Sequence, residues 1–235
     1  MLKGMSIPER ISDRLAEIQG QIKQLADDRP VTLVAVSKYA SIEQMREAYA
    51  AGIRHFGENK VQDALAKIAA FPPADYPNLQ WHLIGNLQSN KVKKTIDQFA
   101  LIHAIDSIRL AEALSVQAMA AGQRQAILLQ VNLSEDPSRH GFLPEDVPAA
   151  VAEILGLPGV QVRGLMGMAP PEASLSNDQV ILRRVFGGLR DLKAQVAEEL
   201  GIDLPELSMG MSHDYTHALQ CGATIIRLGN SLFKT

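Results

Sequence analysis

Short apolar segments alternate with longer amphipathic stretches along almost the whole of this 235-residue chain. The first apolar segment, VTLVAVSK at 31–38, is rich in β-branched residues, which is typical of a strand covered on both faces. Seven further segments of this type follow, at 53–59, 79–85, 101–106, 126–132, 160–168, 206–212 and 223–229. Strand and helix thus take turns about eight times without a change in composition, which predicts a single (β/α)8 TIM barrel of the α/β class.

The stretches between the strand segments have helical character, and most of them end at or beside a glycine, as helices often do. They lie at 41–52, 62–71, 107–122, 144–156 and 178–201. An open, doubly wound sheet is the alternative architecture. The G-x-G-x-x-G fingerprint that would favour such a sheet does not follow the first strand, so we prefer the barrel.

An additional helix is predicted ahead of the barrel. Apolar residues at positions 11, 15, 18, 22 and 25 recur at spacings of three and four and form one stripe. Ser6 and Glu9 have the spacing of a capping box at the start of this helix. We therefore interpret 1–235 as one domain, with an N-terminal helix within 1–29 and a barrel over 31–233.

The overall composition excludes several classes of protein. A content of 46% hydrophobic residues argues against disorder, and a formal net charge of −3 provides no positive field for nucleic acid or acidic lipid. Cys221 is the single cysteine, which excludes an internal disulfide. The first residues lack the pattern of a signal peptide, and no run approaches about 20 apolar residues. A cytoplasmic location is therefore expected.

Polar residues end several of the predicted strands: Lys38, Asn59, Asn132, Ser212 and Arg227. The carboxyl ends of barrel strands converge on one mouth, so these residues are candidates for a site there. At the end of a buried strand, Lys38 would lie near low dielectric, which favours a neutral, nucleophilic amine that forms imines with aldehydes. The alternative is a lysine whose side chain extends past the strand end into water.

The segment LGNSLF at 228–233 has features of a phosphate site. Barrel enzymes commonly bind phosphate with the loops after the last two strands and a short helix N-terminus, and Gly229 and Asn230 follow the last strand here. The alternative is that these two residues only turn the chain. Arg227 lies on the same face of that strand as Gly229, and if buried it needs a partner, for which Asp214 and Glu58 are candidates.

Some other patterns are less informative about function. His213 and His217 resemble the zinc motif H-E-x-x-H, but Asp214 is no substitute for the missing Glu and no third ligand is evident, so no metal is expected. The irregular stretches 134–142 and 169–178 should lie on the rim of the mouth. Lysines 91, 93 and 94 form either a solvated face or a rim that steers anions.

A set of motifs spread over 31–233 resembles the pyridoxal 5'-phosphate homeostasis proteins, which are related to the N-terminal domain of alanine racemase. The motifs are VAVSK, HFGENKVQ, WHLIGNLQSNKVK, QVN, RGLMGM, LSMGMSHD and IRLGNSLF, in this order along the chain. The resemblance implies a barrel of the fold-type III kind and pyridoxal 5'-phosphate (PLP) as the cofactor. The chain differs from the family at Asn230, where the family usually has Thr or Ser, and at Lys234, where the family often has Gly.

The resemblance also assigns roles to residues. Lys38 would carry the internal aldimine to the cofactor aldehyde, and Arg227 would face the pyridine nitrogen. Ser212, Gly229 and Asn230 would hold the phosphate, while Asn59, His82 and Met211 would line the ring or its 3'-oxygen. Asn132 could replace Asn59 or His82.

Three functions are considered for this site. An arginine beside the pyridine nitrogen keeps that nitrogen unprotonated and weakens the ring as an electron sink. Racemisation needs two bases on opposite faces of the substrate, and in alanine racemase the second base comes from a further domain. We therefore expect a non-catalytic protein of vitamin B6 homeostasis that holds PLP exchangeably on Lys38. The alternative is a PLP-dependent amino-acid racemase, and a phosphosugar aldolase that uses Lys38 is a third, weaker possibility.

The carrier interpretation predicts a yellow protein, whereas an aldolase would be colourless. Apo forms of PLP-dependent enzymes are its expected partners, in addition to the small-molecule cofactor. Neither nucleic acid nor a membrane is expected to bind, and a monomer is predicted.

Overall fold

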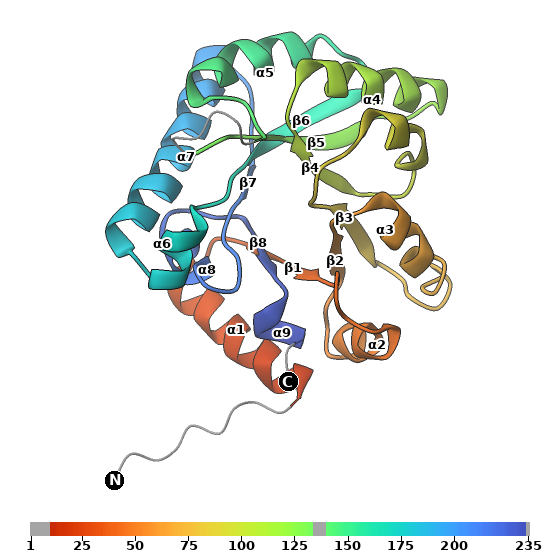
Figure 1. The fold of residues 1–235 in the computed structure, drawn as a ribbon, viewed down its shortest axis with the longest axis vertical. Helices are drawn as coiled ribbons and strands as arrows, with labels where there is room; N and C mark the ends of the chain where they lie inside the picture. Colours follow the sequence, from red (N-terminus) through yellow and green to blue (C-terminus); the bar gives the residue numbers. More distant parts are fainter. Residues whose placement is uncertain (1–9, 134–139, 234–235) are drawn as a thin grey trace.

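Residues 10–133 and 140–233, which the computed structural model describes, form a closed barrel of eight parallel strands in chain order (Figure 1). The strands are β1 (Thr32–Val36), β2 (His55–Glu58), β3 (Gln80–Leu83), β4 (Leu101–Ile105), β5 (Gln125–Gln130), β6 (Val160–Met166), β7 (Glu206–Ser208) and β8 (Ile225–Leu228). Pairing of β1 with β8 closes the ring. The predicted barrel is thereby confirmed and the open sheet is wrong.

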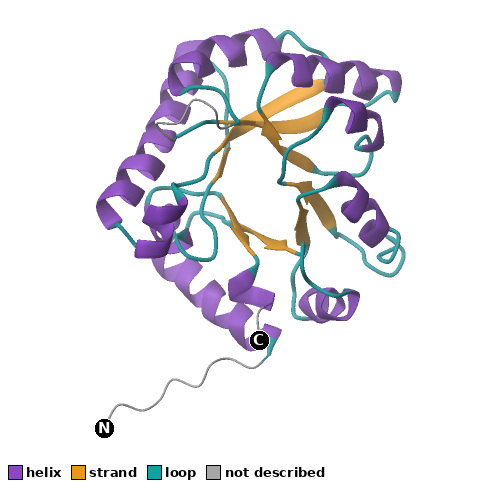
Figure 2. Cartoon of the chain, in the orientation of Figure 1, coloured by secondary structure: helices purple, strands orange, loops and turns teal. Residues whose placement is uncertain are grey.

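Helices surround the strands on the outside of the barrel (Figure 2). The α-helices are α1 (Ile11–Leu25), α2 (Ile42–Ala50), α3 (Val61–Ile68), α4 (Ile108–Ala120), α5 (Val147–Leu155), α6 (Pro171–Ser176), α7 (Gln179–Leu200), α8 (Tyr215–Gln220) and α9 (Asn230–Phe233). Two 3-10 segments, η1 (Ser89–Lys94) and η2 (Pro144–Asp146), complete the layer among the described residues. Helices α3, α4, α5, α7 and α8 pack directly against the strands, which are therefore covered and rich in branched apolar residues.

The predicted N-terminal helix is present as α1, and its apolar stripe is buried at Ile11, Leu15 and Ile18. The helix packs against α2, α8 and α9 (Figure 1). On the same face Arg14 Nη1 donates to the carbonyl oxygen of Leu232 over 3.0 Å. This contact ties α1 to the segment that follows β8. The capping box predicted at Ser6 and Glu9 lies outside the described residues.

The apolar interior has two parts. The larger cluster fills the space between strands and helices, and a smaller one comprises Val34, Leu101, Ala104, Leu128, Met166 and Ile225. Members of the smaller cluster alternate along the strands with members of the larger one, for example Leu128 between Ile127 and Leu129. Because successive strand residues point to opposite faces, the smaller cluster lies inside the barrel.

Two sequence predictions need correction at the rim. The stretch 169–178 is not irregular, because it contains the short helix α6. The strand predicted over 206–212 ends at Ser208, since Gly210 has a φ of +92° that strand pairing does not accommodate. Most of the other predicted rim loop, 134–139, lies outside the described residues. Among the residues described, no helix is both long and apolar enough to cross a membrane.

Candidate functional site

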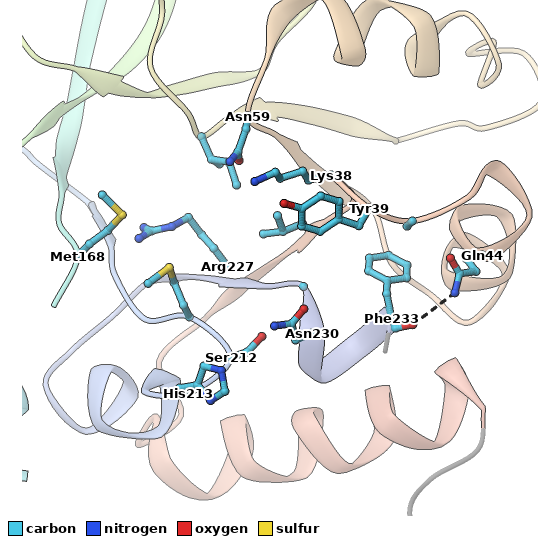
Figure 3. A pocket seen from close by; sticks show the side chains of 15 residues that line it. Lys38, Tyr39, Gln44, Asn59, Met168, Ser212, His213, Arg227, Asn230 and Phe233 are labelled. Carbon is cyan, nitrogen blue, oxygen red and sulfur yellow. Dashed lines mark hydrogen bonds between the residues drawn. The ribbon is translucent and has the colours of Figure 1, made fainter. Parts of the chain in front are cut away.

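A pocket of about 520 Å³ opens at the carboxyl ends of β1 and β8 (Figure 3). Its lining comprises Val36, Lys38, Tyr39, Ala40, Gln44, Asn59, Ile84, Met168, Met211, Ser212, His213, Arg227, Gly229, Asn230 and Phe233. The volume lies in the range that accommodates a small organic ligand. The position is the one at which barrel enzymes place their active sites.

Most of the site residues predicted from the sequence line this pocket. Lys38, Asn59, Met211, Ser212, Arg227, Gly229 and Asn230 all line it. His82 does not, because it lies one layer deeper inside the barrel and is hydrogen-bonded on both sides by other histidines. Asn132 contributes to a separate surface pocket with Leu133 and Arg184. Neither His82 nor Asn132 is therefore brought into contact with the candidate site.

Lys38 is exposed at the mouth, which agrees with the alternative that its side chain extends past the strand end into water rather than with an amine in low dielectric. Its Nζ lies 4.6 Å from the ring centroid of Tyr39, a pocket residue that is 84% exposed. Hydrogen bonding and the positive charge of Lys38 lower the pKa of the Tyr39 hydroxyl. Sequence reasoning missed Tyr39 because β1 ends at Val36, so strand alternation no longer separates residues 38 and 39.

A buried ion pair anchors the backbone just before Lys38. The Glu58 carboxylate oxygen Oε1 accepts from Lys67 Nζ and from Ser37 Oγ, each over 2.7 Å. Lys67 Nζ also donates to the carbonyl oxygen of Ser37 over 2.5 Å. Glu58 is fully buried, and its other oxygen has no hydrogen-bond partner. This cluster joins the ends of β1 and β2 beneath Lys38 and Asn59.

Arg227 is buried at the floor of the pocket without a carboxylate partner. Its Nη1 donates to Ser208 Oγ over 2.5 Å and its Nη2 to the carbonyl oxygen of Gly167 over 3.1 Å. Within the described chain no carboxylate forms an ion pair with it. Burial lowers the pKa of Arg227 to about 10, and the charge of Asp214 opposes this shift. The guanidinium therefore stays charged at neutral pH and is compensated by neutral acceptors.

The partners predicted for Arg227 are engaged elsewhere. Glu58 pairs with Lys67, as described above. Asp214 accepts from Ser174 Oγ of α6 over 2.5 Å and from the Met211 backbone N–H over 2.6 Å. Asp214 thus holds the loop after β7 against α6, and the predicted pairing of Arg227 with either carboxylate is wrong.

The loop after β7 and the start of α9 meet on the opposite side of the pocket from Asn59 (Figure 3). Ser231 N–H donates to Ser212 Oγ over 3.2 Å, which holds the two segments together. A Cβ on Gly229 would lie 3.3 Å from the Val36 carbonyl oxygen, so a glycine favours the close approach of β1 here. Gln44 Nε2 donates to the Phe233 carbonyl oxygen over 3.3 Å and fixes the far end of α9 (Figure 3). Polar groups and small residues therefore surround this part of the pocket.

A row of three histidines, two of them buried, lies behind Arg227. His55 Nδ1 and His82 Nε2 are 2.9 Å apart, as are His82 Nδ1 and His103 Nε2. His103 Nδ1 lies 2.9 Å from Ser208 Oγ, the atom that Arg227 contacts. Burial lowers the pKa of His82 to about 3, and burial lowers the pKa of His103 well below its ordinary value. Sequence reasoning missed His103 because contacts between distant strands leave no local pattern.

His213 and His217, the pair that resembles a zinc motif, do not converge on a common point. His213 lines the pocket, whereas His217 Nε2 lies 2.8 Å from Asn177 Oδ1 at the end of α6. No group of three potential metal ligands occurs in the part of the chain that the structure describes. Cys221, at the end of α8, is buried, and burial raises the pKa of its thiol.

Comparisons with known proteins agree on one family. The family described as alanine racemase, N-terminal domain, matches residues 12–235. The pyridoxal phosphate homeostasis protein of Pseudomonas aeruginosa is 39% identical over 228 residues, which cover 95% of this chain and 94% of that protein. PipY of Synechococcus elongatus, solved with PLP bound, is 41% identical, with a TM-score of 0.83 and coverage of 95% of this chain and 100% of PipY.

A more distant structure extends the likeness of fold. Alanine racemase of Clostridium difficile superposes with a TM-score of 0.75 at 13% identity, over 94% of this chain and 56% of the racemase. At this identity the likeness shows the barrel fold alone.

Proposed function

The chain belongs to the pyridoxal phosphate homeostasis protein family, and on that premise we propose that it binds PLP reversibly at the β1–β8 pocket and acts as a carrier of the cofactor. The observation that carries this proposal is that one pocket contains a lysine amine, a buried guanidinium and the small residues Ser212, Gly229 and Asn230. Each matches a different part of PLP: the aldehyde, the pyridine nitrogen and the phosphate.

The residues of the pocket fit the chemistry of this ligand. When bound, PLP supplies an aldehyde that condenses with a primary amine, and Lys38 is the lysine in the lining. Arg227 would donate to the pyridine nitrogen, since its guanidinium has N–H groups beyond those used by Ser208 and Gly167. Ser212, Gly229 and Asn230 would hold the phosphate, and Asn59 and Met211 would line the ring. Asn230 can donate from its amide where a hydroxyl is usual in the family.

Two features favour a carrier over a catalyst. The pKa of Arg227, about 10, keeps its guanidinium protonated, so a pyridine nitrogen facing it accepts a hydrogen bond and stays unprotonated. A racemase needs a second base across the substrate from its lysine. Tyr39 stands beside Lys38, with its ring 4.6 Å from Nζ, rather than across from it. These features support storage and release of PLP more than proton transfer at a substrate carbon.

We expect PLP to attach to Lys38. The protein mixed with PLP should show a yellow absorbance band, and after borohydride reduction peptide mass spectrometry should find the adduct on Lys38. Lys38→Ala should lose the band and the adduct, because among the described residues no other amine lines the pocket. Lys60→Ala removes a neighbouring exposed lysine and should retain both. An adduct located elsewhere, or a band that persists in Lys38→Ala, would refute this binding mode.

We also expect no sustained turnover of amino acids. The PLP-loaded protein should leave L-alanine, D-alanine and L-serine as single enantiomers during prolonged incubation, as chiral chromatography would show. It should, however, restore the activity of an added apo-enzyme that depends on PLP. Racemisation through many turnovers per protein molecule would instead establish the racemase and exclude the carrier.

A further inference from the structure

A continuous row of hydrogen-bonded side chains runs through the barrel interior to the floor of the pocket. It begins at His55 on β2, passes through His82 on β3 and His103 on β4, and reaches Arg227 on β8 through Ser208 on β7. His82, His103, Ser208 and Arg227 are all buried, whereas His55 is partly exposed. Only the last member, Arg227, lines the pocket.

The arginine favours one direction for the hydrogen bonds in this row. A guanidinium has only donors, so Ser208 Oγ accepts from Arg227 and its hydroxyl proton is left for His103 Nδ1. His103 then carries its proton on Nε2 and donates to His82 Nδ1. His82 in turn donates from Nε2 to His55 Nδ1. In this direction each imidazole is neutral and protonated on Nε2.

The row does more than pair the hydrogen-bonding groups of its own residues, because it ends at Arg227 in the pocket. The Ser208 hydroxyl can rotate, and when its proton goes to another acceptor both of its lone pairs are available to Arg227. His103 Nδ1 is that acceptor, and His82 holds the imidazole of His103 in the required tautomer. Donors and acceptors that follow one another in a chain also strengthen each other at low dielectric. Because the histidines stay neutral, they add no positive charge beside the guanidinium.

We propose that Ser208, His103 and His82 are positioning residues that hold the Arg227 guanidinium in the orientation in which its remaining N–H groups face the pyridine nitrogen of bound PLP. This inference rests on the proposed function and adds to it the residues that control the contact with the ring. Preference for a ligand with a ring nitrogen should therefore depend on side chains that never touch the ligand.

The test compares two ligands, PLP and its analogue in which carbon replaces the pyridine nitrogen. The unchanged protein should bind PLP more tightly, and Ser208→Ala should reduce this preference about tenfold, the order of one hydrogen bond to a charged group. His103→Leu should reduce it similarly, whereas His103→Asn should restore it in part, because the Asn oxygen can accept from Ser208. A role in stability alone would weaken both ligands equally and leave the preference unchanged, which would overturn the proposal.

A second measurement needs neither a variant nor a ligand. In protein labelled with ¹⁵N-histidine, the imidazole nitrogen shifts should show His55, His82 and His103 protonated on Nε2 and unprotonated on Nδ1 at neutral pH. A proton on His103 Nδ1 would reverse the row and overturn the proposal. If neither ligand binds the unchanged protein, the proposed function fails and this proposal fails with it. If both bind and the preference survives Ser208→Ala, this proposal alone fails.

Discussion

Lowering the pH from 6.5 to 5 is expected to cost the protein about 2 kcal/mol of folding free energy through His82 alone. The pKa of His82 is about 3 in the folded protein because of burial and the neighbouring His55, and about 6.5 in an unfolded chain. Below pH 6.5 the His82 imidazole binds a proton in the unfolded state but not in the folded state. Stability is therefore complete above pH 6.5 and falls as the pH decreases, until the folded imidazole itself titrates near pH 3.

The other two histidines of the row add to this loss. The pKa of His103 is lowered by burial, then by His82 and Arg227, and the pKa of His55 is lowered by burial while Glu206 opposes the shift. The total decrease between pH 6.5 and 5 should thus exceed the share of His82. This window lies above the ordinary pKa of carboxylates, so acid titration of Asp and Glu contributes little there.

Urea unfolding followed by circular dichroism at a series of pH values measures this effect. His82→Gln should be less stable at pH 7 but should lose less stability between pH 6.5 and 5, because one of the titrating groups is gone. His213→Gln, at an exposed histidine, is the matched control for the change of residue type. A slope that is the same in His82→Gln as in the unchanged protein would contradict a neutral, buried His82.

Replacing Lys67 with methionine is expected to destabilise the protein by about 3–5 kcal/mol. The substitution leaves the Glu58 carboxylate, which is 1% exposed, without its counter-charge and with one oxygen already unpartnered. It also removes the donor to the Ser37 carbonyl oxygen, so the end of β1 before Lys38 should loosen. Weaker PLP binding should therefore accompany the lower stability.

A double variant separates the charge from the packing. Lys67→Met with Glu58→Gln removes both charges and should recover much of the lost stability, because no uncompensated ion remains buried. Lys60→Met changes an exposed lysine at the start of α3 and should stay within about 0.5 kcal/mol of the unchanged protein. Denaturant midpoints of the four proteins give the comparison. A loss below about 1 kcal/mol in Lys67→Met would mean that Glu58 is neutral or solvated.

Much of the architecture could be predicted from residue order. The barrel follows from the alternation of apolar strands with amphipathic helices, because these two periodicities differ and each must bury its apolar face. The strand ends were predicted less well, as β7 shows, since local backbone geometry at Gly210 stops the pairing. The pocket lining was largely predictable because parallel strands bring Lys38, Arg227 and the residues after them to the same mouth.

The surroundings of those residues were not predictable in the same way. Exposure of Lys38, its contact with Tyr39 and the choice of Lys67 as the partner of Glu58 depend on side-chain directions at strand ends, where alternation no longer applies. The row from His55 to Arg227 crosses between strands that are far apart in the chain. Such contacts exist only once the sheet has closed, because closure alone sets which inward side chains share a layer. Residue order therefore determined the barrel and its mouth, and packing across the closed barrel decided how its charges are held.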